Sequence, residues 1–424
     1  MKHVVRKVAA LGVALALVAS GCSDDDGGSE AADEERSTTT EAPTADDPGD
    51  EPADDPSDDP GEAEAPAVEE FTGSVDDFYV VPDPLPAGEP GTLIRTMPVD
   101  APDGQVGLRV MYRSTDAEGD ARAATGLIYH PDGEAPADGW PILAWAHGTS
   151  GLAASCAPSR GPAVPPAFGV EGVLVQPDYI GLGPEGEIHP YLSAAAEGHA
   201  VIDLVAAARS VPEAGAGDRW VVTGVSQGGH AALVTGEQAA ERLPDAELLG
   251  TVAIAPGAEL GTDFGDALQI RIITTMVLVG VAAEDPSVDL ADYLSPPAVE
   301  AAASIEEGCV GDILNTMPAV AGAPDYWVTD PRTSPVGEAW LEANDPGQVV
   351  ADAPLLVVQG GQDILVVPAR TDALIERLCG IGQVVELLEV PEGDHDTVTG
   401  LAEDDITAWV AARFAGEDPT TTCP

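Results

Sequence analysis

A five-residue segment, Gly-Val-Ser-Gln-Gly at residues 224–228, limits this chain to folds in which a strand turns sharply into a helix. It follows residues 219–223, an apolar and β-branched run typical of a buried strand, and it opens a helix pattern over residues 227–242. Such a turn leaves little room for side chains, so glycines flank Ser226. It places the serine hydroxyl at a helix N-terminus, where the helix dipole favours negative charge. A glycine-rich turn without chemical function remains an alternative, since two glycines in five residues recur by chance.

Two side chains much later in the sequence can supply the groups that a reactive serine needs. Residues 354–358 form an apolar strand pattern that leads to Asp363, and residues 384–390 form another that leads to His395. The carboxyl ends of parallel strands meet at one edge of a sheet, so we expect these side chains near the serine. A serine hydroxyl needs an imidazole to accept its proton, and the imidazole needs a carboxylate to fix its tautomer. The sequence therefore predicts a catalytic triad of Ser226, Asp363 and His395.

Other acidic residues compete for the carboxylate role in this triad. Asp394 and Asp396 stand on either side of His395. Adjacent residues rarely reach the Nδ1 atom of a histidine in triad geometry, which favours Asp363. A histidine in an acidic surface loop remains the alternative interpretation of His395.

The remaining histidines in the body of the chain carry weaker signals. His130 precedes Pro-Asp-Gly and is expected in a turn, while His189 and His199 fall in a loop and at a helix start. His230 lies one turn beyond Ser226 on the same predicted helix, where packing is the expected role. None has the spacing of a metal-binding motif, so we expect no metal site, and the predicted triad needs no organic cofactor.

An earlier strand-to-loop junction is predicted to stabilise the oxyanion of the reaction. Residues 141–147 form a buried strand pattern that opens into Gly148, Thr149 and Ser150. In triad enzymes one backbone N–H comes from such a loop and another from the residue after the nucleophile, here Gln227. Thr149 and Ser150 are both candidates for the loop donor, and the sequence does not choose between them.

These motifs resemble the secretory lipase family, the lipase A-like branch of the α/β-hydrolases, over about residues 75–424. The elbow at residues 224–228, the segment Val-Gln-Pro-Asp-Tyr-Ile-Gly at 175–181 and the acid loop at 361–368 are similar to motifs of that family. The oxyanion segment at 146–151 looks closer to bacterial than to fungal members. The preference of the fungal members for long acyl chains is therefore not carried over.

The resemblance implies an α/β-hydrolase fold, a mostly parallel sheet flanked by helices. Alternating strand and helix patterns predict the same fold class. The predicted strands before the elbow are 106–115, 123–130, 141–147 and 172–178, and the predicted helices outside it are 194–209, 371–379 and 401–414.

A helical cap is expected within the catalytic domain, which spans residues 73–424. The sixth predicted strand is 249–255, and the sheet pattern does not return until residue 354. A structureless loop of that length is improbable, so we expect a helical cap at about residues 257–348, inserted after the sixth strand. In lipase A-like enzymes the cap covers the site and shapes an acyl pocket, so the resemblance implies acyl ester substrates. A helical domain without a role in substrate choice is the alternative.

The cysteines are also explained by the resemblance. It implies the pairings Cys156–Cys309 and Cys379–Cys423, one of the three pairings that four cysteines permit. Cys22 is then the odd cysteine, and two disulfides suit an oxidising, extracytoplasmic compartment.

The first 72 residues have the composition of a targeting segment and a linker. Residues 1–22 combine a basic start, an apolar stretch and small residues that end in Cys22, which resembles a bacterial lipobox with a lipidated cysteine. A plain secretory signal is the alternative. Residues 23–72 are rich in Asp, Glu and Pro and are predicted to form a disordered tether.

The charge of the chain excludes one class of partner. Its formal net charge is −57, and both of its lysines lie in the predicted signal segment. Nucleic-acid binding depends on Lys and Arg contacts to phosphates, so we expect no nucleic-acid partner.

The sequence as a whole predicts an extracytoplasmic serine hydrolase of carboxylic esters, a triacylglycerol lipase or a carboxylesterase that works as a monomer. We expect contact with the membrane only through the lipid anchor at Cys22. A serine peptidase or acyltransferase of the same fold is one alternative. A surface lipoprotein without catalysis is the other, because a fold does not secure a function.

Overall fold

The computed structural model describes residues 68–261 and 267–424. The predicted signal segment with Cys22 and the predicted tether up to residue 67 lie outside the described residues. The tether boundary predicted at residue 72 is too late. Strand β1, Glu69–Glu70, already pairs in parallel with β2, Leu93–Val99, and the Phe71 ring contacts the Phe78 ring edge to face.

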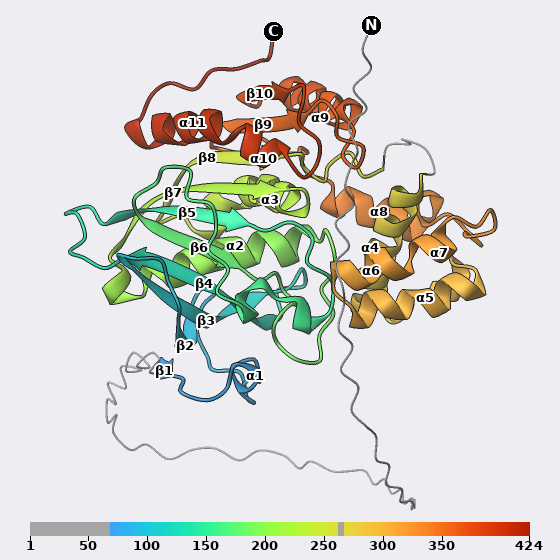
Figure 1. Ribbon diagram of the computed structural model, residues 1–424, viewed down its shortest axis with the longest axis horizontal. Coiled ribbons are helices and arrows are strands. Elements are labelled where there is room, and N and C mark those ends of the chain that lie inside the picture. Colours follow the sequence, from blue (N-terminus) through green and yellow to red (C-terminus); the bar gives the residue numbers. More distant parts are fainter. Residues whose placement is uncertain (1–67, 262–266) are drawn as a thin grey trace, which may run out of the picture. The chain divides into compact units, whose positions relative to one another are not determined.

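The described residues form a ten-stranded sheet with the order β1-β2-β3-β4-β6-β5-β7-β8-β9-β10 (Figure 1). From β6 to β10 neighbouring strands run parallel, whereas β2, β3, β4 and β6 pair antiparallel. The strands after β2 are β3 Gln105–Thr115, β4 Ala121–Pro131, β5 Trp140–Ala146, β6 Val173–Pro177, β7 Ala216–Val225, β8 Glu247–Ile254, β9 Leu355–Gly360 and β10 Val385–Val390.

Helices cover both faces of this sheet. In β7, Trp220 and Val222 pack into the cluster beneath helix α2, while Val221 between them packs into the cluster of the opposite face. The alternation makes the strand apolar on both sides, as a covered parallel sheet requires. One face carries α2 Ala194–Arg209, α3 Gln227–Arg242 and α9 Pro368–Ile381; the other carries α10 Val398–Leu401 and α11 Glu403–Ala415. The predicted α/β fold, a mostly parallel sheet flanked by helices, is confirmed.

Two strands at the edge of the sheet were absent from the sequence prediction. β1 is only two residues long, and β2 contains Pro98 and Arg95, which weaken a strand pattern. Their presence corrects the strand count: the strand that precedes the cap, predicted as the sixth, is β8 in chain order.

A helical insertion separates β8 from β9 and forms a body of its own beside the sheet (Figure 1). Its helices are α4 Leu268–Glu284, α5 Pro296–Glu307, α6 Val310–Thr316, α7 Pro318–Ala321 and α8 Pro335–Asn344; the short helix α1, Val75–Phe78, lies outside it near the N-terminal strands. The insertion has its own buried apolar cluster, in which Ile272, Met276 and Ile313 participate. It is therefore a packed cap rather than a loop.

The two ends of the cap are joined by one arginine. Arg377 on α9 donates from Nε to Glu259 at 2.9 Å and from Nη1 to Asp345 at 3.0 Å. Asp345 also accepts the backbone N–H of Leu260 at 3.1 Å. Charge-assisted bonds of this kind are stronger than neutral ones, so the base of the cap is held to helix α9, which packs on the sheet.

The structure contains two disulfides with the pairings that the resemblance implied. Cys156–Cys309 links the loop after β5 to the start of α6, and Cys379–Cys423 links α9 to the C-terminal tail. The first bond therefore joins the sheet to the cap. Among the described residues, no helix combines the length and the apolar character needed to cross a membrane.

Candidate active site

The elbow at the end of β7 is a point of close backbone approach. Ser226 has φ 59° and ψ −116°, a conformation that is costly for an L-residue. A Cβ atom on Gly228 would lie 2.0 Å from the carbonyl oxygen of Ala146, and one on Gly224 would lie 2.1 Å from the carbonyl oxygen of Gly228. Both glycines are thus needed because β5, β7 and α3 meet here. The turn lifts Ser226 above the carboxyl ends of the strands.

The structure brings the predicted histidine and carboxylate together. His395, in the loop after β10, donates from Nδ1 to Oδ2 of Asp363 at 2.7 Å. Asp363 is 3% exposed, and its Oδ1 accepts the backbone N–H groups of Leu365 and Val366 at 2.8 and 2.9 Å. These bonds fix the carboxylate and leave its second oxygen for the imidazole. The other ring nitrogen of His395 is then available to a nucleophile.

The competing carboxylates have other positions. Asp394 accepts hydrogen bonds at Oδ1 from the backbone N–H of Thr397 at 3.0 Å and from its hydroxyl at 2.5 Å. Asp396 is exposed and lines the cavity described next. The imidazole of His395 therefore pairs with Asp363.

Ser226 and His395 line the same cavity, which has a volume of about 580 Å³. The segments that follow β5, β7, β9 and β10 contribute one side, and α4 and α6 of the cap contribute the other through Ile272, Met276 and Ile313. The predicted nucleophile and base therefore face a common space whose cap side is mostly apolar.

The candidate oxyanion donors occupy different places. Gln227 is the first residue of α3, so its backbone N–H stands at the helix N-terminus beside Ser226. Thr149 lines the cavity. The carbonyl oxygen of Ser150 accepts the N–H of Val310 at 2.8 Å, which directs this residue toward the cap. The geometry favours Gln227 and Thr149 over Ser150.

Two tyrosines hold the loop that carries Thr149. The Tyr179 hydroxyl donates to the carbonyl of His147 at 2.8 Å, and the Tyr191 hydroxyl and the Thr149 hydroxyl are 2.7 Å apart. The His147 ring stacks on Tyr179 with centroids 4.3 Å apart. Burial lowers the pKa of His147 to about 4, although its hydrogen bond to Gly148 opposes the change. His147 is therefore neutral at pH 7.

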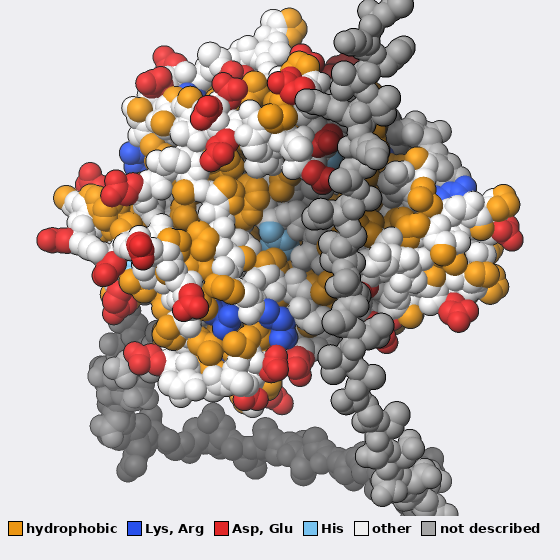
Figure 2. Space-filling view, viewed as in Figure 1, with side chains coloured by type: hydrophobic (Ala, Val, Ile, Leu, Met, Phe, Trp, Pro, Cys, Tyr) orange, Lys and Arg blue, Asp and Glu red, His pale blue; other side chains and the backbone are white. Residues whose placement is uncertain are grey.

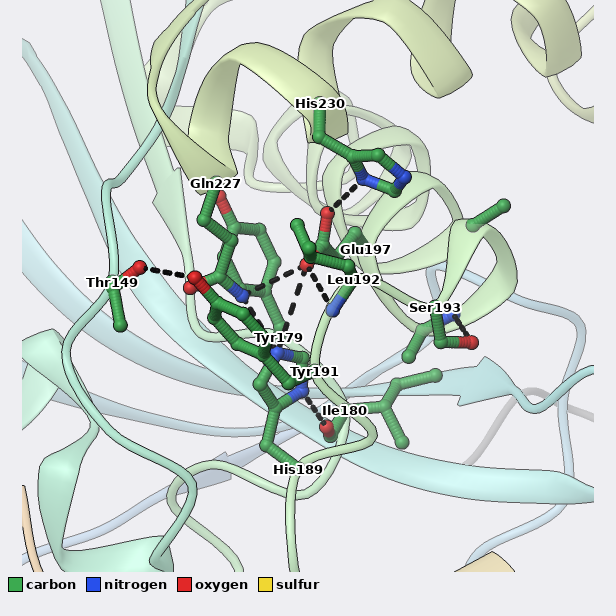
Figure 3. A network of polar contacts seen from close by, with 12 residues as sticks. Thr149, Tyr179, Ile180, His189, Tyr191, Leu192, Ser193, Glu197, Gln227 and His230 are labelled. Atoms are coloured by element: carbon green, nitrogen blue, oxygen red, sulfur yellow. Dashed lines mark hydrogen bonds and ion pairs between the residues drawn. The ribbon is translucent and has the colours of Figure 1, made fainter. Parts of the chain in front are cut away.

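A buried polar network behind the elbow was missed in the sequence. Glu197 of α2 contacts the side chains of Gln227, His189 and His230 (Figure 3). The sequence predicts His189 in a loop and a packing role for His230. A glutamate among small and apolar helix residues was the signal available in the sequence, because buried charges require partners.

The described residues contain no group of three or more His, Cys, Asp or Glu side chains arranged to hold a metal ion.

Residues 168–422 match the model of the secretory lipase family. The chain belongs to this family. It is also similar to a Mycobacterium tuberculosis (strain CDC 1551 / Oshkosh) protein named "Probable inactive lipase MT1628". The two are 24% identical over 380 residues, which cover 82% of this chain and 83% of the relative.

Solved structures share the secretory lipase fold seen here. Candida antarctica lipase A in its closed state aligns with a TM-score of 0.66 at 15% identity, over 82% of this chain and 87% of that one. A ligand-bound form of LipA, a rice cell wall degrading esterase of Xanthomonas oryzae, aligns with a TM-score of 0.61 at 19% identity, over 77% and 98% of the respective chains. At these identities the likeness shows the fold.

The close approach at the elbow predicts that one added methyl group strongly lowers the stability of the fold. Gly228→Ala should lower the free energy of unfolding by about 3 kcal/mol or more, the upper end for single substitutions. Gly380→Ala is the control, because its Cβ would meet nothing within 4 Å on helix α9. It should raise stability by about 0.5–1 kcal/mol. Urea unfolding of both variants measures the difference, and equal stabilities would contradict the steric argument.

The neutral, buried state of His147 predicts a loss of stability in acid. The unfolded chain takes up a proton near the ordinary pKa of 6.5, whereas the folded state resists protonation down to about 4. Stability is therefore complete above pH 6.5 and falls as the pH drops toward 4, by about 3 kcal/mol for this group. His147→Asn should remove that share of the pH dependence in urea unfolding. An unchanged slope in the variant would show that His147 does not cause it.

Proposed function

We propose that this protein is an extracytoplasmic serine hydrolase that cleaves carboxylic esters, as a triacylglycerol lipase or a carboxylesterase. The observation that carries the proposal is the 2.7 Å bond from His395 to Asp363 at a cavity that Ser226 also lines. Three separate chain segments supply a hydroxyl, an imidazole and a carboxylate, the groups that nucleophilic catalysis by serine uses, and this supports the proposal.

The reaction uses these groups in a defined order. The Ser226 hydroxyl attacks the ester carbonyl while His395 takes its proton, and the Asp363 carboxylate stabilises the resulting imidazolium. The oxyanion of the tetrahedral intermediate accepts the N–H groups of Gln227 and Thr149. The alcohol leaves with the proton from His395, and Ser226 retains the acyl group. Water then attacks the acyl-enzyme and gives a proton to His395. As the bond to the Ser226 oxygen breaks, His395 returns that proton to the oxygen, and the carboxylic acid leaves.

The cavity indicates an acyl chain as the group next to the reacting carbonyl. Helices α4 and α6 present Ile272, Ile273 and Ile313 to it. Leu314 lines this cavity and is 58% exposed, and the half-buried Leu365, two residues after Asp363, also lines it. Apolar side chains at a cavity mouth are suited to a substrate that partitions out of water.

We place the protein outside the cytoplasm, attached to the membrane only through a lipid on Cys22, and working as a monomer. The two disulfides support an oxidising compartment. On the face shown in Figure 2, acidic side chains stand around the periphery and Lys or Arg side chains appear at few places. Such a surface repels polyanions, which supports a function without nucleic acid.

The alternatives differ in what consumes the acyl-enzyme or in whether it forms. A serine peptidase would form it from an amide, and an acyltransferase would pass it to an acceptor alcohol or amine. A surface lipoprotein without catalysis would not form it, and one relative is named an inactive lipase. Labelling of Ser226 by a fluorophosphonate separates the last alternative from the others, because the reagent reacts only with an activated serine.

We expect the purified protein, residues 23–424, to hydrolyse a series of p-nitrophenyl esters and to lose this activity in Ser226→Ala. Loss of the nucleophile removes the acyl-enzyme route, a fall in rate of about 10⁴-fold or more. The measurements are the release of p-nitrophenol and mass spectrometry of the protein after fluorophosphonate treatment.

The outcomes distinguish a lipase from a carboxylesterase, and both from a protein without this activity. Highest activity on long acyl chains would support a lipase, and highest activity on short chains a carboxylesterase. Ester turnover that persists in Ser226→Ala, or folded wild-type protein that neither labels nor turns over, would contradict the proposal.

The apolar mouth predicts a difference between dissolved and aggregated substrate. Leu314→Gln should slow hydrolysis of emulsified triacylglycerol by about tenfold, the factor that corresponds to roughly 1.4 kcal/mol of lost apolar burial. Its rate on a dissolved short-chain ester should not change. Val328→Gln is the matched control, since Val328 is 62% exposed on the cap and lies outside the lining of the catalytic cavity. Equal effects of both variants on the emulsion would argue against a lipase.

A further inference from the structure

A glutamate buried behind the nucleophile holds several groups at once. The Glu197 side chain has no solvent exposure. Its Oε1 accepts the side-chain amide of Gln227 at 2.8 Å and the backbone N–H of Leu192 at 3.1 Å, and its Oε2 lies 2.6 Å from Nδ1 of His230 (Figure 3). A carboxylate this deeply buried is stable only when such partners satisfy it.

The contacts of Gln227 determine which way its amide faces. Nδ1 of His189 lies 2.8 Å from the carbonyl oxygen of Ile180 and so carries the ring proton, which leaves Nε2 to accept. The amide nitrogen of Gln227 is 2.7 Å from that Nε2 and 2.8 Å from Glu197, so its two hydrogens go to these two acceptors. The reverse orientation would set the amide oxygen against the carboxylate. The residue that offers an oxyanion N–H is therefore clamped through its side chain.

His230 balances the charge of the glutamate. Its Nδ1 faces Glu197 and its Nε2 is 2.8 Å from the carbonyl oxygen of Asn344, so both nitrogens face acceptors. Burial alone would lower the pKa of His230, but these two acceptors raise it above its ordinary value. Burial would raise the pKa of Glu197, yet the charge and hydrogen bond of His230 lower it below its ordinary value. The pair is an imidazolium and a carboxylate. Asn344 ends helix α8, so the cap docks on the same pair.

The other half of the predicted oxyanion site connects to the same carboxylate. Leu192 has φ 59°, and the bond from its N–H to Glu197 accompanies this strained conformation. The preceding residue is Tyr191, whose hydroxyl is 2.7 Å from the Thr149 hydroxyl. A path of direct contacts thus runs from Glu197 to both Gln227 and the Thr149 loop.

We propose that Glu197 is the positioning residue of the oxyanion site, holding Gln227 and the Thr149 loop in the geometry that the tetrahedral intermediate requires. The inference rests on the proposed hydrolase function and names a residue that acts through others. A bare carboxylate behind the site would oppose the developing oxyanion. The paired imidazolium of His230 cancels this charge while the hydrogen bonds remain.

Glu197→Gln tests the proposal, because it keeps the size of the side chain and removes its charge. We expect kcat on the preferred p-nitrophenyl ester to fall about tenfold to a hundredfold, the cost of displacing an oxyanion donor, with little change in KM. The inhibition constant of a trifluoromethyl ketone should rise by the same factor as kcat/KM falls. Its hemiketal adduct places a negative oxygen in the oxyanion site, as the transition state does.

The matched control uses the same two helices at a place farther along each from the site. Asp203 of α2 is 2% exposed and pairs with Arg242 of α3, whose Nη2 is 2.6 Å from its Oδ2. Asp203→Asn also removes a buried charge between α2 and α3 but touches no residue of the site. It should lower the melting temperature while kcat and the ketone inhibition constant remain at the wild-type values. Thermal unfolding of all variants is measured in parallel.

A second variant covers the case in which Glu197→Gln does not fold. Gln227→Met keeps the backbone N–H and removes the side-chain bonds to Glu197 and His189, so it should show the same fall in kcat and the same rise in the inhibition constant. Wild-type kcat in a folded Glu197→Gln or Gln227→Met variant would overturn the inference while the hydrolase function stands. Equal loss in Asp203→Asn would also overturn it. A wild-type protein without turnover would overturn the proposed function, and this inference with it.

Discussion

The site depends on the close contact of three backbones at the elbow. Gly224 and Gly228 lack the methyl groups that would collide with neighbouring carbonyls, since a Cβ on either would lie 2.1 or 2.0 Å from a backbone oxygen, and this allows β5, β7 and α3 to meet. Ser226 sits at their junction in a conformation that only such surroundings maintain. The height of Ser226 above the sheet, and its position relative to the loop after β5, both follow from that contact.

Beneath this junction the protein buries charge rather than apolar side chains. Glu197 and His230 are fully buried, and both carboxylate oxygens and both ring nitrogens have hydrogen-bond partners. A buried ion pair contributes little net stability against an apolar replacement, so its presence is better explained by what it orients. Asn344, at the end of cap helix α8, contacts the same pair, so the cap and the helices behind Ser226 meet at one buried ion pair.

Much of the fold could be predicted because its signals are local. The helices 194–209 and 227–242 were predicted with the bounds that the structure has, since small and apolar residues repeat there with helical spacing. β2 was missed because Pro98 and Arg95 interrupt its pattern, which an edge strand tolerates. The boundary of the tether was misplaced because two strand residues, Glu69 and Glu70, are acidic like the segment before them.

The sequence by itself determined the elbow, the order Ser226, Asp363 and His395, and the existence of an insertion, because each is written in neighbouring residues or in the spacing of apolar runs. Only the tertiary structure decided that His395 bonds to Asp363 rather than to its acidic neighbours, and that Thr149 rather than Ser150 faces the cavity. Only the tertiary structure shows that Glu197 contacts Gln227, Leu192 and His230 at once. These are contacts between segments far apart in the chain, and packing, not local propensity, chooses among residues of the same type.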